Sequence, residues 1–170
     1  MITIILHPFE PVFDIDSEIL ILGSFPSVKS REHQFFYGHP QNRFWRVLAA
    51  VFNSDMPQTI EEKKAFLLKN HIALWDVIAS CDVEGSSDSS IKNVIPNDLS
   101  VILRAAKIKQ IFVNGKTAEK YYNKYRRSAI GKAAVCLPST SPANAAYSID
   151  CLVAEWSKIK QAAAFESDNL

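Results

Sequence analysis

The sequence predicts a three-layer α/β/α fold in which a central, mainly parallel four-stranded sheet lies between two layers of helices. Short apolar segments alternate along the chain with amphipathic segments, and no internal repeat or change of composition marks a linker. Strands that are separated by helices pair in parallel, and right-handed crossovers place the helices on both faces of the sheet. The length of 170 residues suits one domain, so we expect a single domain over residues 1–170, with a frayed tail from about residue 166.

Four apolar segments are the predicted strands of this sheet. The segment Glu18–Gly23 (EILILG) is apolar at every position between its ends, as in a strand that is buried on both faces. The other predicted strands are Ile72–Ile78, Gln110–Asn114 and Ala133–Leu137.

Helices are predicted between the strands and after the last one. Thr59 and Glu62 form a capping box at the start of a helix that runs to about His71. Asn97 is the predicted N-cap of a helix that runs to about Lys107. The other predicted helices are Asn42 to about Phe52, Lys116–Arg127 and Ile149 to about Phe165. The predicted loops are Gly23–Gln41, Cys81–Asn93 and Pro138–Asn144.

The composition excludes several classes of protein. With 48% apolar and 22% charged residues, the chain is neither disordered nor collagen-like. Its longest unbroken apolar run, Val47–Phe52, is too short to cross a bilayer, and Met1–Leu6 carries no basic residue. We therefore expect a cytoplasmic protein that does not bind a membrane. Three cysteines and four histidines are scattered along the chain, which predicts neither a disulfide framework nor a metal site.

The formal net charge of +1 hides an uneven distribution of charged residues. Residues 92–132 contain ten basic and two acidic side chains, whereas residues 55–88 contain three lysines and seven acidic side chains. A basic face of this kind suits a polyanion such as a nucleic acid. A solvated helix face produces the same pattern, so the charge alone does not decide between the two interpretations.

The unusual residues of the sequence follow the ends of the predicted strands. In an open parallel sheet the ligand-binding crevice lies beyond the carboxyl ends of the strands. The residues that the sequence places there are Gly23–Ser27, Asp76, Asn114 with Gly115, and Ser139–Asn144. The Gly-x-x-Pro turn exposes backbone N–H groups, which suit a negatively polarised atom. Tyr37, which ends a run of three aromatic residues, is suited to a slot for a flat ring.

Two side chains are candidates for handling a water molecule in this crevice. Asn42 could orient a water or hydrogen-bond a base, and its alternative role is an ordinary N-cap. Asp76 ends a strand at the edge of the crevice, and its alternative role is a strand-end residue that bonds to the backbone.

Several common motifs are absent. Gly115-Lys116-Thr117 imitates the end of a phosphate-binding P-loop, but Gln110 stands where that loop needs its first glycine. The sequence has neither GxSxG nor GxGxxG, which argues against an esterase and a dinucleotide-dependent enzyme.

The crevice motifs resemble those of the uracil-DNA glycosylase superfamily, and most closely its hypoxanthine-DNA glycosylase branch. The matching segments are Gly23–Ser27 (GSFPS), Tyr37–Trp45 (YGHPQNRFW), Leu74–Asp76 (LWD), Asn114–Lys116 (NGK) and Pro138–Asn144 (PSTSPAN). The resemblance implies a monofunctional enzyme of base excision repair. It would hydrolyse the N-glycosidic bond of deaminated bases in DNA, chiefly hypoxanthine, with uracil and xanthine as further candidates, by base flipping and water attack. It also implies that no metal or organic cofactor takes part.

The resemblance further implies roles for individual residues. Several relatives have Asp or Asn at the position of Phe25, so the water-positioning role passes to Asn42. Ser139 aligns with the histidine that stabilises the leaving group, and Ala143 aligns with the intercalating leucine. The predicted base-binding residues are Ser24, Phe25, Tyr37, Asp76 and Asn114. The predicted DNA-binding residues are Ser27, Lys29, Arg43, Lys116, Ser141, Ala143 and Asn144.

Alternative functions stay open on the sequence alone. The chain is also similar to the mismatch-specific uracil-DNA glycosylases. Because the acidic residue of the first motif is missing, a non-catalytic module that binds nucleic acid or nucleosides is another alternative. We expect DNA, as duplex or single strand, to be the partner and the protein to be a monomer.

Overall fold

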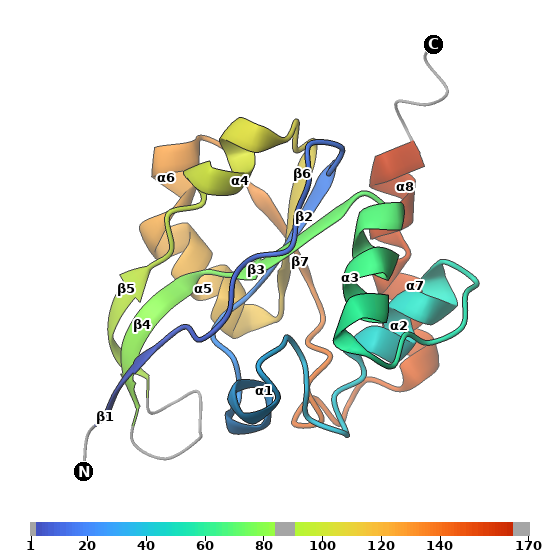
Figure 1. Cartoon of the computed structure of the whole chain (residues 1–170), viewed down its shortest axis with the longest axis horizontal. Coiled ribbons are helices and arrows are strands. Elements are labelled where there is room, and N and C mark those ends of the chain that lie inside the picture. Colours follow the sequence, from blue (N-terminus) through green and yellow to red (C-terminus); the bar gives the residue numbers. More distant parts are fainter. Residues whose placement is uncertain (1–2, 84–90, 165–170) are drawn as a thin grey trace.

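The computed structural model describes residues 3–83 and 91–164 of the chain. Its centre is a four-stranded sheet with the order β3-β2-β6-β7, in which all neighbouring strands run parallel (Figure 1). The strands are β2 (Ile19–Gly23), β3 (Ile72–Asp76), β6 (Gln110–Asn114) and β7 (Ala134–Leu137). The predicted fold class is therefore confirmed.

Helices cover both faces of this sheet because the side chains of β2 are buried on both sides. Ile19 and Ile21 pack into one hydrophobic cluster, and Leu20 and Leu22 pack into another. This alternation follows from the two-residue period of a strand. The helices are α1 (Val28–His33), α2 (Phe44–Val51), α3 (Ile60–Lys69), α4 (Ser100–Ala105), α5 (Lys116–Tyr125), α6 (Arg127–Ile130), α7 (Ile149–Trp156) and α8 (Lys158–Ala164).

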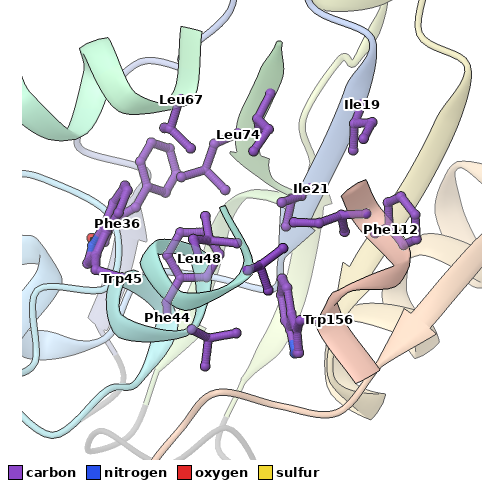
Figure 2. Close-up of a cluster of buried hydrophobic side chains, with 14 of the residues drawn as sticks. Ile19, Ile21, Phe36, Phe44, Trp45, Leu48, Leu67, Leu74, Phe112 and Trp156 are labelled. Carbon is purple, nitrogen blue, oxygen red and sulfur yellow. The ribbon is translucent and has the colours of Figure 1, made fainter. Parts of the chain in front are cut away.

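The cluster around Ile21 joins the sheet to α2, α3, α7 and α8. Figure 2 shows Ile21 and Phe112 from the sheet facing Leu48 of α2 and Trp156 of α7. The second cluster joins the other face to α4 and α5, through residues such as Tyr122, which is fully buried. None of the helices in the described part of the chain has the length and apolar character needed to cross a membrane.

A second, antiparallel sheet departs from the prediction. Its strands are β1 (Thr3–Leu6), β4 (Ile78–Val83) and β5 (Lys92–Pro96), in the order β1-β4-β5. The single strand predicted over Ile72–Ile78 ends at Asp76, and β4 includes part of the predicted loop Cys81–Asn93. Small and polar residues of β4 suggested a loop, but pairing with a strand on each side satisfies their backbone groups. Part of that predicted loop, residues 84–90, lies outside the described residues.

Several helix boundaries also differ from the prediction. Asn97 does not cap α4, because its side-chain Nδ2 donates to the backbone oxygens of Asp76 and Ile78 at 2.9 and 3.2 Å. The closing helix is divided at Ser157 into α7 and α8, and its predicted end at Phe165 lies outside the described residues. The helix α1 lies within the predicted loop Gly23–Gln41.

Candidate active site

A cavity of about 190 Å³ lies at the carboxyl edge of the central sheet. The strand register brings its walls together, since Gly23 at the end of β2 pairs with Asp76 at the end of β3. We call it the carboxyl-edge cavity. The predicted site residues that line it are Ser24, Phe25, Ser27, Tyr37, Asn42, Asp76, Asn114, Lys116, Ser139 and Ser141.

Thr140 connects two of these residues through hydrogen bonds whose directions are determined. The backbone N–H of Thr140 donates to Oδ1 of Asn114 at 3.1 Å, so Nδ2 of Asn114 is the donor to the Thr140 hydroxyl, at 3.0 Å. The hydroxyl therefore donates onward to Oδ1 of Asn42, at 2.9 Å. The backbone N–H of Phe44 donates to the same Oδ1 at 3.0 Å. Because a backbone N–H can only donate, the orientations of both amides are determined.

This chain of hydrogen bonds leaves one end of Asn42 available. Both acceptor positions of Oδ1 are occupied, whereas Nδ2 has no hydrogen-bond partner within residues 3–83 and 91–164. Asn42 is half-buried and lines the carboxyl-edge cavity. Its Nδ2 group is therefore a donor that a ligand or a water molecule in the cavity can use.

Asp76 is the buried carboxylate of the carboxyl-edge cavity. Its Oδ2 lies 2.8 Å from Nε2 of His7, and Nδ1 of His7 lies 2.8 Å from the backbone oxygen of Phe9. The side chains of His7 and Asp76 are only 4% and 5% exposed. His7, which directly follows β1, thus contacts the wall of the cavity through Asp76.

Tyr37 stands beside Asp76 with its ring stacked on Phe44, at a centroid distance of 4.0 Å. Its hydroxyl is buried, and the side chain of Asn114 is one of its polar neighbours. Burial, and then the charge of Asp76, raise the pKa of Tyr37 well above its usual range, so the phenol keeps its proton.

Gly23 leaves the space in which these two polar groups lie. A Cβ atom at this position would lie 2.4 Å from Oδ1 of Asp76 and 2.9 Å from the hydroxyl of Tyr37. Any side chain larger than glycine would have to displace the carboxylate. The glycine of the first motif is therefore required by its surroundings in space.

The loop that follows β7 is held in place by Arg43. The guanidinium of Arg43 donates to the backbone oxygens of Ser141 at 3.2 Å, of Asn144 at 3.0 Å, and of Tyr147. The side chain of Asn144 donates to the backbone oxygen of Ser139 at 3.0 Å. These bonds give the loop a defined shape beside the carboxyl-edge cavity.

Comparisons with known proteins show the family to which this chain belongs. Residues 10–160 match the family model of the uracil DNA glycosylase superfamily. The chain belongs to this superfamily. Its sequence is 40% identical, over 139 residues, to a hypoxanthine DNA glycosylase of Methanosarcina barkeri (strain Fusaro / DSM 804). This alignment covers 80% of this chain and 86% of that protein. It is also 39% identical, over 142 residues, to a hypoxanthine DNA glycosylase of Methanosarcina acetivorans. This second alignment covers 82% of this chain and 89% of that protein.

A solved structure has the same fold as this member of the superfamily. It is a solution NMR structure from Methanosarcina acetivorans assigned to the uracil DNA glycosylases, with a TM-score of 0.76 and 34% sequence identity. The alignment covers 94% of this chain and 99% of that chain. The resemblance predicted from the sequence motifs is therefore confirmed.

Four of the predicted site residues do not line the carboxyl-edge cavity. Ala143 and Asn144 belong to the loop after β7, and Arg43 binds that loop. Lys29 is exposed on α1 and pairs with Glu32 at 3.3 Å. Their roles in DNA binding stay predictions.

The basic segment 92–132 extends away from the carboxyl-edge cavity. Lys116 begins α5 at the cavity, and the helix leads from there to α6, which lies with α4 at the opposite end of the molecule from α1 (Figure 1). At that end Arg126 donates to the backbone oxygen of Asn97 at 2.7 Å, and Lys132 donates to that of Ile108 at 2.7 Å. These two cations therefore hold backbone segments together.

Arg31 lines the carboxyl-edge cavity from α1 and lies over the ring of Phe25, at 5.9 Å. Sequence reasoning missed two residues of this site. Thr140 lies within the matched motif Pro138–Asn144, but its central position in the hydrogen-bond chain was not predicted. His7 carried no signal, because it is separated from Asp76 by 69 residues. The described residues contain no group of His, Cys, Asp and Glu that could hold a metal ion.

Proposed function

We propose that this protein removes hypoxanthine from DNA by hydrolysing its N-glycosidic bond. Its enzyme class, DNA glycosylase, follows from the superfamily, and the two Methanosarcina relatives named hypoxanthine DNA glycosylase favour this base. The observation that carries the proposal is the carboxyl-edge cavity, in which Asn42, Asp76 and Tyr37 come together from separate elements. DNA is accordingly the substrate.

The target base must leave the helix before it can reach this cavity. Flipping a nucleotide out of a duplex costs a few kcal/mol, and this cost is lowest for mispaired or damaged bases. Once flipped, the base lies against Tyr37 and Phe25, which line the cavity. Asp76, Asn114 and Ser24 then contact its edge.

The reaction separates charge between the sugar and the base. The bond between C1′ and the base nitrogen breaks, and its electron pair leaves with the base. A donor preplaced at the developing anion contributes about 3 kcal/mol, by analogy with the removal of oxyanion-hole donors. The hydroxyl of Ser139 accepts from the backbone N–H of Ser141 at 3.1 Å, which leaves its own proton available for this role.

Water completes the hydrolysis at C1′. Nδ2 of Asn42 donates to the oxygen of this water, which leaves a lone pair of the water free to form the new bond. A neutral amide suffices if the water adds after the base has begun to leave, because the sugar cation then needs no strong base. One proton of the water stays on the new hydroxyl group at C1′, and the other passes to solvent. The base anion takes up a proton from solvent, so the products are the free base and an abasic site.

DNA contacts surround the opening of the cavity. Lys116, Ser27 and Ser141 line it and are suited to phosphate oxygens. We assign entry into the duplex to the loop that carries Ala143 and Asn144, because Ser139 and Ser141 of the same loop line the cavity. Arg43 acts by holding this loop, since its donors are directed to the loop backbone.

Single-turnover excision from oligonucleotides tests the proposal. Single strands and duplexes that contain inosine, uracil or xanthine are incubated with the protein, and abasic sites are cleaved with alkali. We expect inosine to be excised, and Asn42→Ala to lower its rate by about 100-fold or more. Asp76→Ala, measured beside it, tests the alternative residue for the water. Asn123→Ala, on the exposed face of α5, is the matched control that keeps full activity.

The other outcomes identify the alternatives. Uracil that is excised much faster than inosine would indicate a mismatch-specific uracil enzyme. Tight binding without any excision would indicate a non-catalytic module. Undiminished excision by the Asn42→Ala variant would refute the role given to that amide.

A further inference from the structure

The pairing of His7 with Asp76 has a consequence for the choice of base. We infer that His7 is a positioning residue that keeps one carboxyl oxygen of Asp76 free of protons, so that this oxygen accepts the ring N–H of a deaminated base. The inference rests on the proposed function and deepens it. It adds a specificity role for a residue in the segment that follows β1.

The position of the proton between His7 and Asp76 follows from two contacts. Nδ1 of His7 lies 2.8 Å from the backbone oxygen of Phe9, and because a carbonyl only accepts, Nδ1 carries a proton. Nε2 lies 2.8 Å from Oδ2 of Asp76, a distance that requires a proton between these two atoms. The proton belongs either to the ring or to the carboxyl group. In both cases it lies on the Oδ2 side of Asp76.

The other oxygen of Asp76 is consequently a pure acceptor. Oδ1 has no hydrogen-bond partner among the residues that the structure describes, and it lies above Gly23, on the wall of the carboxyl-edge cavity. The backbone of Asp76 is held in place as well, because its oxygen accepts from Nδ2 of Asn97 at 2.9 Å. Oδ1 therefore offers an acceptor whose position is well defined.

The surroundings of His7 explain why the ring is needed. Its neighbours are aromatic rings, with centroid distances of 4.7 Å to Phe9 and 5.9 Å to Phe25. A carboxyl group that is buried in such surroundings without a partner is neutralised by binding a proton. Without His7 no described residue keeps that proton on Oδ2, and a proton on Oδ1 would turn the acceptor into a donor.

Deamination of adenine or cytosine changes the edge of the base in a way that this acceptor can detect. Hypoxanthine has an N–H at N1 where adenine has a lone pair, and uracil has an N–H at N3 where cytosine has a lone pair. The N–H of a deaminated base donates to Oδ1, whereas the lone pair of the parent base faces the same oxygen and leaves it unpaired. A site built around one such bond discriminates by up to about 10⁴-fold against the analogue that cannot make it.

Binding to two oligonucleotides measures this discrimination directly. The probes are single strands that carry either 2′-fluoro-deoxyinosine or 2′-fluoro-deoxyadenosine, which resist cleavage and require no base pair to be opened. The measured quantity is the ratio of their dissociation constants. We expect the wild type to prefer inosine, and His7→Phe, which keeps the aromatic shape, to reduce this preference by about 10-fold or more.

Three further variants keep the test independent of the stability of His7→Phe. Gln at position 7 can still donate to Oδ2, so His7→Gln retains most of the preference. Asp76→Asn retains it too, because neutral His7 accepts from the new amide N–H and leaves the amide oxygen toward the cavity. Asp76→Leu removes the acceptor and abolishes the preference. His33→Phe, the same exchange at an exposed position of α1, is the matched control.

The outcomes separate this inference from the proposed function. If the wild type excises no hypoxanthine and binds both strands equally, the proposed function itself fails. If the wild type prefers inosine but the folded His7→Phe variant binds both strands more weakly by the same factor, His7 is merely structural and the inference fails. The inference also fails if the Asp76→Asn variant prefers inosine no more than the Asp76→Leu variant does.

Discussion

Replacing Thr140 with valine tests the hydrogen-bond chain that orients Asn42. Thr140 is fully buried, and valine keeps its shape while it removes the hydroxyl. That hydroxyl accepts from Asn114 at 3.0 Å and donates to Asn42 at 2.9 Å, so the exchange removes two neutral hydrogen bonds. At about 1 kcal/mol for each bond, we expect the free energy of unfolding to fall by about 2 kcal/mol.

Excision should fall together with stability. Oδ1 of Asn42 keeps only the Phe44 N–H, so the amide can rotate about its side-chain torsions. A displacement of about 1 Å at a reacting group costs up to 10²-fold in rate. We therefore expect Thr140→Val to lower single-turnover excision of hypoxanthine by about 10- to 100-fold at saturating protein.

Thr140→Ser is the matched control, because serine keeps the hydroxyl and loses only a methyl group. Its expected cost in stability is about 1 kcal/mol, and its excision rate should stay close to that of the wild type. Urea unfolding measures the stabilities, and the excision rates are measured where each variant is folded. Equal stability and equal excision by the valine and serine variants would refute the hydrogen-bond chain.

Three other predictions follow from the site. Gly23→Ala should lower excision by about 100-fold, because its Cβ would lie 2.4 Å from Oδ1 of Asp76. Arg43→Lys should lower it by about 10-fold and expose the loop after β7 to proteolysis, because a lysine cannot replace a planar guanidinium that binds several carbonyls. Lys116→Ala should reduce the slope of log K against log salt by about 0.9, whereas Arg126→Ala should lower the melting temperature and leave the slope unchanged.

Each of these predictions has a clear contrary result. Gly131→Ala is the control for a loss of stability alone, since it strains a left-handed backbone (φ +75°) but its Cβ meets nothing within 4 Å. An equal loss of excision in both variants would count against the crowding argument. A loop that resists protease in the Arg43→Lys variant would show that the guanidinium does not hold it. A lower salt slope in Arg126→Ala would mean that this side chain contacts phosphate.

The sequence alone determined the fold class and the edge of the sheet that carries the site. Apolar segments such as Gln110–Asn114, alternating with amphipathic ones, predicted parallel strands, and this strand is found with those bounds. The carboxyl end of each predicted strand can be located in the sequence, and in a parallel sheet these ends lie at one edge. The motifs at Gly23–Ser27 and Ser139–Asn144, which follow two such ends, could therefore be assigned to one crevice. Local patterns suffice for this, because hydrophobic periodicity is a property of short stretches of chain.

Only the tertiary structure decided which polar groups touch within that crevice. His7 meets Asp76 across 69 residues, and Thr140 meets Asn42 across 98 residues. No local pattern marks such pairs, and β1 and β4 also escaped prediction because their strand character depends on their partners in the antiparallel sheet. The direction of each hydrogen bond depends on which donors and acceptors meet in three dimensions, and for Asn42 and Asp76 that direction decides what each side chain offers to a base.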